Sequence, residues 1–132
     1  MDTERLIEIA LAYREKAYVP YSNFKVGAAV LTEDDKIFGG CNIENASYGA
    51  TNCGERTAIF KAVSEGYSSF KAIAIVGDLK KLTAPCGICR QVMAEFLSKD
   101  AKVILATSKT DYVIKTMQEV LPGAFVKDDL IN

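Results

Sequence analysis

Residues 51–58 read TNCGERTA, and this stretch combines a predicted helix start with a candidate site. It opens a segment, 52–65, in which apolar residues recur at helical spacing. Asn52 followed three residues later by Glu55 fits a capping-box pattern, in which the carboxylate serves only the helix backbone. Cys53, however, lies two positions before Glu55. The stretch therefore predicts a thiol and a carboxylate together on the first turn of a helix.

Predicted strands and helices alternate on both sides of this helix, which indicates an α/β fold. Only SKTD, residues 108–111, separates the last two strands, and four residues cannot hold a crossover helix. These strands should therefore pair antiparallel. We predict one domain over 1–132, a three-layer α/β/α sandwich around a mixed five-stranded sheet. The predicted helices cover 3–17, 52–65, 86–97 and 118–125, and the predicted strands cover 24–32, 36–44, 71–78, 101–107 and 112–117.

Composition narrows the class of protein. The 132 residues carry a net charge of −1, from 16 basic and 17 acidic side chains, which argues against a nucleic-acid-binding protein. No apolar run approaches the length of a membrane span, and the acidic start MDTERLIEIA does not resemble a secretory signal. Four cysteines without an export signal favour a reducing compartment. We therefore expect a cytoplasmic protein with no membrane partner.

The chain contains no histidine, so a metal site must use thiolates and carboxylates. PCGIC, at 85–89, supplies Cys86 and Cys89 at the start of a second predicted helix. If the two helices lie side by side, these thiols meet Cys53, and three ligands leave the fourth position of a zinc ion open for water. Glu55 is then the best-placed general base. Alone, the C-x-x-C pair also fits a redox dithiol, half of a structural zinc site, or chance.

A fourth cysteine, Cys41, would close the zinc site and abolish catalysis if it joined the other three. On its predicted strand, however, Cys41 points opposite to the polar side chains of Asn42 and Glu44. A small buried core thiol is the favoured interpretation.

The chain resembles the zinc-dependent nucleoside and nucleobase deaminases, whose signature is C/H-x-E followed by P-C-x-x-C. CGE and PCGIC carry this signature. YVPYSNFKVGAAV, CNIENASYG, CGERTA, PCGICRQV and LPGAF, in this order, are similar to the small cytidine deaminases. The resemblance covers essentially the whole chain and implies hydrolytic deamination of cytidine and deoxycytidine to uridine and deoxyuridine plus ammonia, in pyrimidine salvage.

The resemblance also implies roles for individual residues. One zinc ion per chain would be held by Cys53, Cys86 and Cys89. Glu55 would be the proton shuttle while zinc-bound hydroxide attacks C4 of the base. Independently of the resemblance, the excess charge of three thiolates favours a hydrogen bond from Arg56 to a ligand sulfur; the alternative is that Arg56 is a surface residue of the first helical turn. The implied substrate-binding residues are Phe24 against the base, Asn42 and Glu44 at the ribose, the backbone of Gly54, which stands where alanine is common, and Tyr48 and Phe125, which in homotetrameric members reach a neighbouring subunit's site.

Four other interpretations remain. A polynucleotide editor is disfavoured, because such members place a helix between the last two strands, where this chain has only SKTD. A deaminase of another aminopyrimidine nucleoside, such as an antibiotic, is disfavoured by NIENA and LPGAF. A non-enzymatic zinc-stabilised module predicts a closed metal shell and no dependence on Glu55. A thiol redox protein predicts a reversible disulfide between Cys86 and Cys89 and no zinc.

Overall fold

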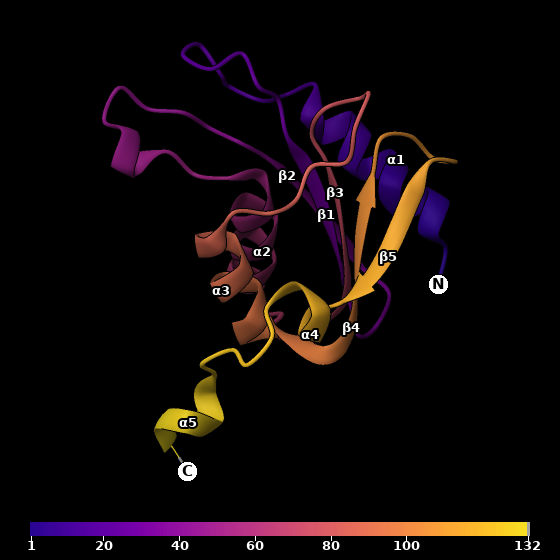
Figure 1. The fold of residues 1–132 in the computed structure, drawn as a ribbon, viewed down its shortest axis with the longest axis vertical. Coiled ribbons are helices and arrows are strands. Elements are labelled where there is room, and N and C mark those ends of the chain that lie inside the picture. Colours follow the sequence, from indigo (N-terminus) through magenta and orange to yellow (C-terminus); the bar gives the residue numbers. More distant parts are fainter. Residues whose placement is uncertain (132) are drawn as a thin grey trace.

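The five strands form a single mixed sheet in the order β2-β1-β3-β4-β5 (Figure 1). The computed structural model describes residues 1–131. β3 and β4 run parallel, whereas every other neighbouring pair is antiparallel, including β4 with β5. The predicted mixed sheet with an antiparallel last pair is confirmed. The strands are β1 Gly27–Thr32, β2 Ile37–Cys41, β3 Phe70–Val76, β4 Leu97–Ala106 and β5 Tyr112–Thr116.

Helices cover both faces of the sheet, so the predicted three-layer sandwich is also confirmed. α1 (Thr3–Arg14) packs on one face, and α2 (Gly54–Ser64) and α3 (Gly87–Phe96) pack on the other (Figure 1). The described residues also form three short helical segments: η1 Tyr48–Ala50, α4 Met117–Val120 and α5 Lys127–Ile131. No helix among residues 1–131 is both long and apolar enough to cross a bilayer.

Strand direction explains why α2 and α3 begin next to each other. β2 and β3 are both antiparallel to β1, so they run in the same direction and end at the same edge of the sheet. α2 follows β2 in the chain and α3 follows β3, so both helices start at that edge. The fold therefore brings together two helix N-termini that are far apart in the sequence.

The buried strands have apolar side chains on both faces, as expected for a sheet between two helical layers. In β3, Ile73 and Ile75 pack under α2 and α3, whereas Ala72, Ala74 and Val76 pack under α1. These side chains are fully buried, and each buried isoleucine stabilises the fold by about 1.5–3 kcal/mol relative to an exposed one. The rigid central strands therefore fix the positions of the two helix starts.

Several predicted element boundaries need correction. The first helix ends at 14 rather than 17, the first strand begins at 27 rather than 24, the second strand ends at 41 rather than 44, and the fourth strand begins at 97 rather than 101. Two further corrections concern helix starts and ends. Asn52 does not cap α2: its backbone pairs with Ile43 in an antiparallel bridge, its Nδ2 donates to Thr57 Oγ1 at 3.1 Å, and Cys53 is the N-cap residue. The C-terminal helix predicted over 118–125 covers only Met117–Val120. A capping box between Thr116 and Glu119 starts that helix one residue before the prediction.

α5 (Lys127–Ile131) was not predicted at all. It lies at the C-terminal end, away from the sheet (Figure 1), and none of its residues is buried. Its five residues show no apolar stripe of helical length, so periodicity contains no signal for it.

Gly27, the first residue of β1, allows α1 to lie directly on the sheet. A Cβ atom there would lie 2.0 Å from the carbonyl oxygen of Ala10 and 2.5 Å from the backbone nitrogen of Arg14. We expect Gly27→Ala to lower the free energy of unfolding by roughly 1–3 kcal/mol or more, because α1 must move away from the sheet. Urea unfolding measures this change.

Gly49, in η1, provides the matched control for that substitution. No atom lies within 4 Å of a Cβ built at Gly49, so Gly49→Ala should change the free energy of unfolding by less than about 0.5 kcal/mol. Equal stabilities of the two variants would contradict the close approach of α1 to β1.

Candidate active site

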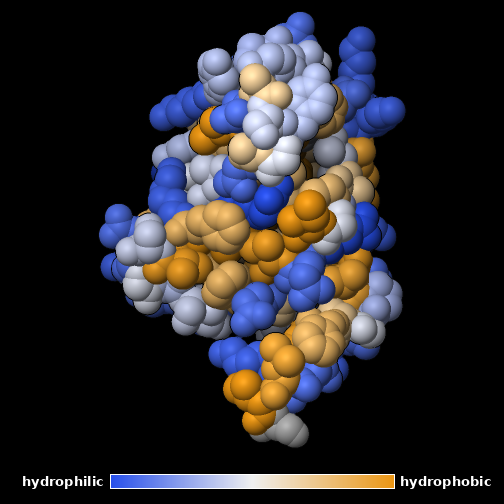
Figure 2. All heavy atoms as spheres, turned by 90° about the vertical axis from the view of Figure 1, so that its left-hand side faces the viewer, coloured by the Kyte–Doolittle hydropathy of each residue, from blue (hydrophilic) through white to orange (hydrophobic). Residues whose placement is uncertain are grey.

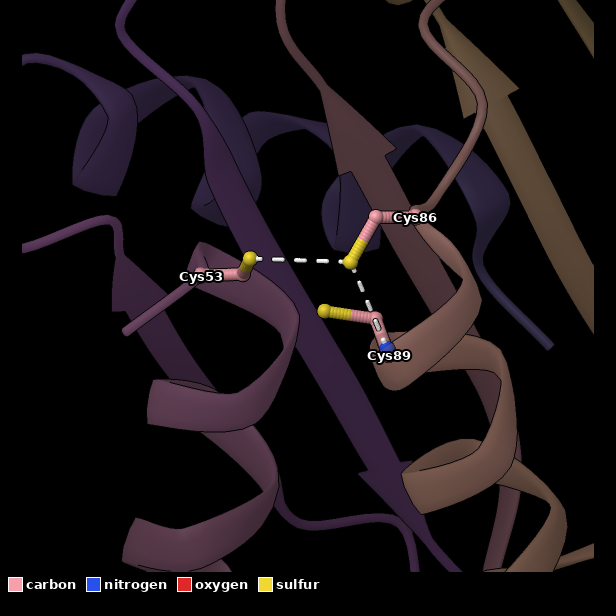
Figure 3. Close-up of side chains that lie close together, drawn as sticks. All are labelled: Cys53, Cys86 and Cys89. Atoms are coloured by element: carbon pink, nitrogen blue, oxygen red, sulfur yellow. Dashed lines mark hydrogen bonds between the residues drawn. The ribbon is translucent and has the colours of Figure 1, made fainter. Parts of the chain in front are cut away.

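Three thiols converge where α2 and α3 begin (Figure 3). Cys53 and Cys86 are the N-cap residues of the two helices, and Cys89 lies in the first turn of α3. The three Sγ atoms all lie within 4.8 Å of one another, and those of Cys53 and Cys86 are 3.8 Å apart. The backbone N–H of Cys89 donates to Sγ of Cys86 at 3.5 Å. Three sulfurs at such spacing form a ligand set suited to a tetrahedral zinc ion.

The surroundings of Cys53 favour its thiolate form. The pKa of Cys53 falls to about 5, because Cys89 donates a hydrogen bond to its sulfur and Arg56 contributes a further bond and a positive charge. The pKa of Cys89 is raised correspondingly, because its proton is shared with the Cys53 thiolate and its side chain is buried. Helix N-termini add favourable partial positive charge. A cation bound between the three sulfurs would stabilise their thiolate forms.

Arg56 lies beside the sulfurs on the first turn of α2. Its Nη2 donates to Sγ of Cys53 at 3.1 Å. Burial opposes the charge of the guanidinium, but the bonds to Cys53 and Cys89 outweigh it, so the pKa of Arg56 is raised. The buried Nε has no hydrogen-bond partner within residues 1–131. A partly buried guanidinium whose buried Nε is an unused donor fits a site that carries excess negative charge, as three thiolates around one zinc ion would.

Glu55 is buried on the same turn of α2, with only 4% of its surface exposed. The pKa of this carboxyl group is raised to about 7, chiefly by burial and also by the neighbouring Cys53 thiolate, while hydrogen bonds and the charge of Arg56 oppose the increase. A carboxyl group with a pKa near neutrality can both accept and release a proton at physiological pH. A residue that served only as a helix cap would not need burial of this kind.

A cavity of about 240 Å³ opens in front of these groups. Cys53, Gly54, Glu55 and Cys86 form its α-helical wall, and Phe24, which is 44% exposed, also lines it. A Cβ at Gly54 would lie 3.1 Å from the carbonyl oxygen of Val26, so an alanine there requires a small shift of the neighbouring backbone. The remaining lining residues are Ser22, Val26, Asn42, Glu44, Thr51, Thr83 and Ala84.

Asn42 and Glu44 both reach this cavity, and both also organise its wall. The Asn42 amide accepts from the backbone N–H of Val26 at 2.9 Å and donates to the carbonyl of Phe24 at 2.7 Å. One N–H and one lone pair of the amide therefore remain for a ligand.

Glu44 is held in a similar way by the turn at Tyr21 and Ser22. Its Oε1 accepts from the backbone N–H groups of Tyr21 (3.0 Å) and Ser22 (3.1 Å), and its Oε2 accepts from the Ser22 hydroxyl. The hydroxyl bond lowers the pKa of Glu44, so the carboxylate is ionised at neutral pH. It is a fixed, charged acceptor at the cavity wall.

Tyr48 and Phe125 lie outside this chain's cavity. Tyr48 is 78% exposed and packs edge-to-face on Tyr21, with ring centroids 6.3 Å apart, and Phe125 is 58% exposed. Cys41 is buried at the end of β2 and belongs to neither the cavity nor the group of three thiols. The structure therefore separates these three residues from Cys53, Glu55, Cys86 and Cys89.

Sequence reasoning missed five lining residues: Ser22, Val26, Thr51, Thr83 and Ala84. Ser22 belongs to YSNF, where Asn23 adopts a positive φ of 60°, and Thr83 closes the loop after β3 by accepting from the Asp78 N–H at 3.0 Å. Loop residues of this kind have no periodic signal. Their only sequence sign is a position close to a predicted site residue, Phe24, Cys53 or Cys86.

Proteins with similar sequences are cytidine deaminases, in agreement with the zinc-binding thiols and the cavity described above. Residues 1–107 match the family described as "Cytidine and deoxycytidylate deaminase zinc-binding region". The chain is 55% identical over 130 residues to the cytidine deaminase of Sporosarcina psychrophila, covering 98% of this chain and 96% of that one. It is 46% identical to a probable cytidine deaminase of Dictyostelium discoideum, with coverage of 98% and 88%.

Solved structures with a similar fold are also cytidine deaminases. The crystal structure of cytidine deaminase from Burkholderia pseudomallei superposes with a TM-score of 0.89 at 53% identity, covering 95% of this chain and 100% of that one. The enzyme from Mycobacterium tuberculosis gives a TM-score of 0.84 at 35% identity, covering 95% and 98%. The three thiols are suited to bind one zinc ion, in agreement with these relatives. The chain belongs to the cytidine and deoxycytidylate deaminase family.

Proposed function

We propose that the protein hydrolyses cytidine and deoxycytidine to uridine and deoxyuridine with release of ammonia, as a step of pyrimidine salvage. The observation that carries this proposal is the buried Glu55 beside three convergent thiols at one cavity. A non-enzymatic zinc site has no need of a carboxyl group with a pKa of about 7 next to an open cavity.

Cys53, Cys86 and Cys89 would hold the zinc ion, with Arg56 stabilising the sulfur charge. When bound, zinc supplies water with a pKa lowered to about 7, and hence a nucleophile at neutral pH. Glu55 accepts one proton as the water oxygen bonds to C4 and passes it to N3 of the ring. It then takes the remaining hydroxyl proton and delivers it to the amino group, which leaves as ammonia. The product keeps the proton at N3 and a carbonyl at C4.

The cavity wall provides the groups that would orient the nucleoside. Phe24 offers an aromatic face to the base, and Gly54 offers a backbone N–H at the start of α2, where no helical acceptor is available. Asn42 and Glu44 would bind ribose hydroxyls with their free amide N–H and carboxylate lone pairs. Their bonds to the Phe24–Val26 and Tyr21–Ser22 backbones keep these acceptors and donors in place before substrate arrives.

Glu44→Gln is expected to raise KM for cytidine about tenfold or more with a smaller change in kcat. The substituted amide lacks the charge that strengthens a hydrogen bond from a sugar hydroxyl, and such bonds contribute about 1.5–3 kcal/mol. Steady-state kinetics measures the change. Glu65→Gln, at an exposed residue just after α2, is the control. A KM within about twofold of the unsubstituted protein, well short of the tenfold expected from that energy, would remove Glu44 from the ribose site.

We also propose a homotetramer in which Tyr48 and Phe125 complete a neighbouring subunit's site. Both aromatic side chains are exposed in the single chain. Apolar side chains gather over the middle of the α2–α3 face and at its lower, C-terminal tip (Figure 2), where Phe60, Ile88, Leu130 and Ile131 are exposed. Light scattering distinguishes a tetramer from a monomer, and a monomer with full activity would exclude a shared site.

We further propose a cytoplasmic enzyme folded as a single domain over residues 1–132. The four cysteines are unpaired, which suits a reducing compartment, and all five strands belong to one sheet.

The test of the proposed activity is direct. Purified protein is analysed for zinc, expected at about one ion per chain, and given cytidine while the ultraviolet absorbance of the base and ammonia release are followed. Turnover with equal amounts of uridine and ammonia supports the proposal. Bound zinc without turnover of cytidine or deoxycytidine would refute it and favour a structural metal site.

A further inference from the structure

One arginine side chain connects the loop before Cys86 to the C-terminal segment. Arg90 lies on the first turns of α3 and is partly buried. Its Nε donates to the carbonyl oxygen of Pro85 at 2.8 Å, and its Nη1 donates to the carbonyl oxygen of Val120 at 2.8 Å. The two carbonyls are 35 residues apart in the chain.

The bond to Pro85 acts on the backbone of Cys86. The Pro85 carbonyl and the Cys86 nitrogen belong to one planar peptide unit, so fixing the oxygen fixes the plane from which Cys86 continues. The Pro85 ring is buried and restricts its own φ angle. Cys86, by contrast, is exposed. The direction of its side chain therefore depends on this backbone and on the bond between its Sγ and the Cys89 N–H.

The bond to Val120 acts on α4. Val120 is the last residue of this four-residue helix, and terminal carbonyls of a helix have no partner within it. The Arg90 cation satisfies one of them. The next side chain, Gln91, donates from Nε2 to the carbonyl oxygen of Phe125 at 2.8 Å. Consecutive side chains of α3 thus hold both ends of the segment 120–125.

We propose that Arg90 is a positioning residue that fixes the Cys86 loop and the carboxyl end of α4 relative to each other. This inference rests on the proposed function for its effect on zinc and on activity. A guanidinium group donates from Nε and Nη1 in two set directions at once, whereas the single ammonium of a lysine cannot reproduce that fork. Metal retention and the order of the C-terminal segment therefore depend on one side chain.

The test compares Arg90→Met and Arg90→Lys with Arg5→Met, which removes an exposed arginine from α1 on the other face of the sheet. Two rates are measured: zinc loss to an excess of a coloured chelator, and hydrogen exchange of the Leu121 amide, which donates to the Met117 carbonyl in α4. Kinetics with cytidine gives kcat and KM in parallel.

Both Arg90 variants should lose zinc about tenfold faster or more, and the Leu121 amide should exchange about tenfold faster. Arg5→Met should change neither rate. If Arg90→Met does not fold, Arg90→Lys provides the same comparison. An unchanged rate of zinc loss, or faster zinc loss without faster Leu121 exchange, would overturn the proposal. If the proposed function is wrong, the unsubstituted protein will show no turnover. Hydrogen exchange of the Leu121 amide in metal-free protein will still show whether Arg90 holds the carboxyl end of α4.

Discussion

Glu55→Gln is expected to lower kcat for cytidine by about 10³-fold or more while zinc stays at about one ion per chain. The amide has nearly the same shape as the carboxyl group, so it fits the buried position on α2. It cannot accept the proton of water or return one to the amino group. A positioned acid–base group contributes about 10²–10⁴-fold to a rate, and here one carboxyl group would serve two successive transfers.

Its unusual pKa explains why this residue suits both transfers. Burial raises the pKa of Glu55 to about 7, so the protonated and ionised forms have similar free energies near neutral pH. An exposed carboxyl group would be almost entirely ionised there and would be a poor proton donor. Substitution by glutamine removes this property without removing a thiol, which separates proton transfer from metal binding.

The control for Glu55→Gln is Glu95→Gln. Glu95 is exposed on α3 and should leave kcat unchanged. Zinc content is measured by elemental analysis and turnover by loss of absorbance. Undiminished turnover by zinc-loaded Glu55→Gln protein would contradict the assigned mechanism. If the variant loses both its zinc and its turnover, Glu55 instead supports the metal site.

Local patterns were sufficient to predict the sheet, whereas the meeting of the thiols was predicted only on the condition that the two helices lie side by side, and from the resemblance to the deaminases. Apolar runs identified the strands, and SKTD was too short for a helix, which made the last pair antiparallel. Cys53, Cys86 and Cys89 followed predicted strand ends. Strands that run in the same direction place such positions at one edge, and this rule needs no side-chain detail.

The errors concern residues whose local preference yields to tertiary contacts. Asn52 has the right chemistry for a helix cap, but its bridge to Ile43 draws it into extended structure, and Cys53 takes the N-cap position. The same bridge secures the loop between β2 and α2. Capping preference is worth only about 1 kcal/mol, so a pair of backbone hydrogen bonds can override it.

Contacts between loops were equally invisible in the sequence. Ser22 is 22 residues from Glu44, yet its backbone and hydroxyl hold that carboxylate, and Arg90 joins two carbonyls that no motif connects. A polar residue in a loop shows neither periodicity nor direction. Only the folded chain shows which of them line the cavity and which support it.

Cys86→Ala is expected to reduce bound zinc far below one ion per chain and to abolish measurable turnover. Removing one of three thiol ligands leaves two, which is fewer than the three protein ligands of a catalytic zinc site. Cys86 is exposed, so its truncation opens no core cavity and the fold should survive. Zinc content, turnover and urea unfolding are measured on the same preparation.

Cys41→Ala is the matched control, because it removes a thiol that lies outside the group of three. Burial raises the pKa of Cys41, so this isolated thiol stays protonated at neutral pH. Its removal should leave both zinc and turnover close to those of the unsubstituted protein. Full zinc content in Cys86→Ala would place the metal elsewhere, and zinc loss in Cys41→Ala would mean a fourth thiol ligand. That second outcome would close the coordination position that water needs, and with it the hydrolytic mechanism.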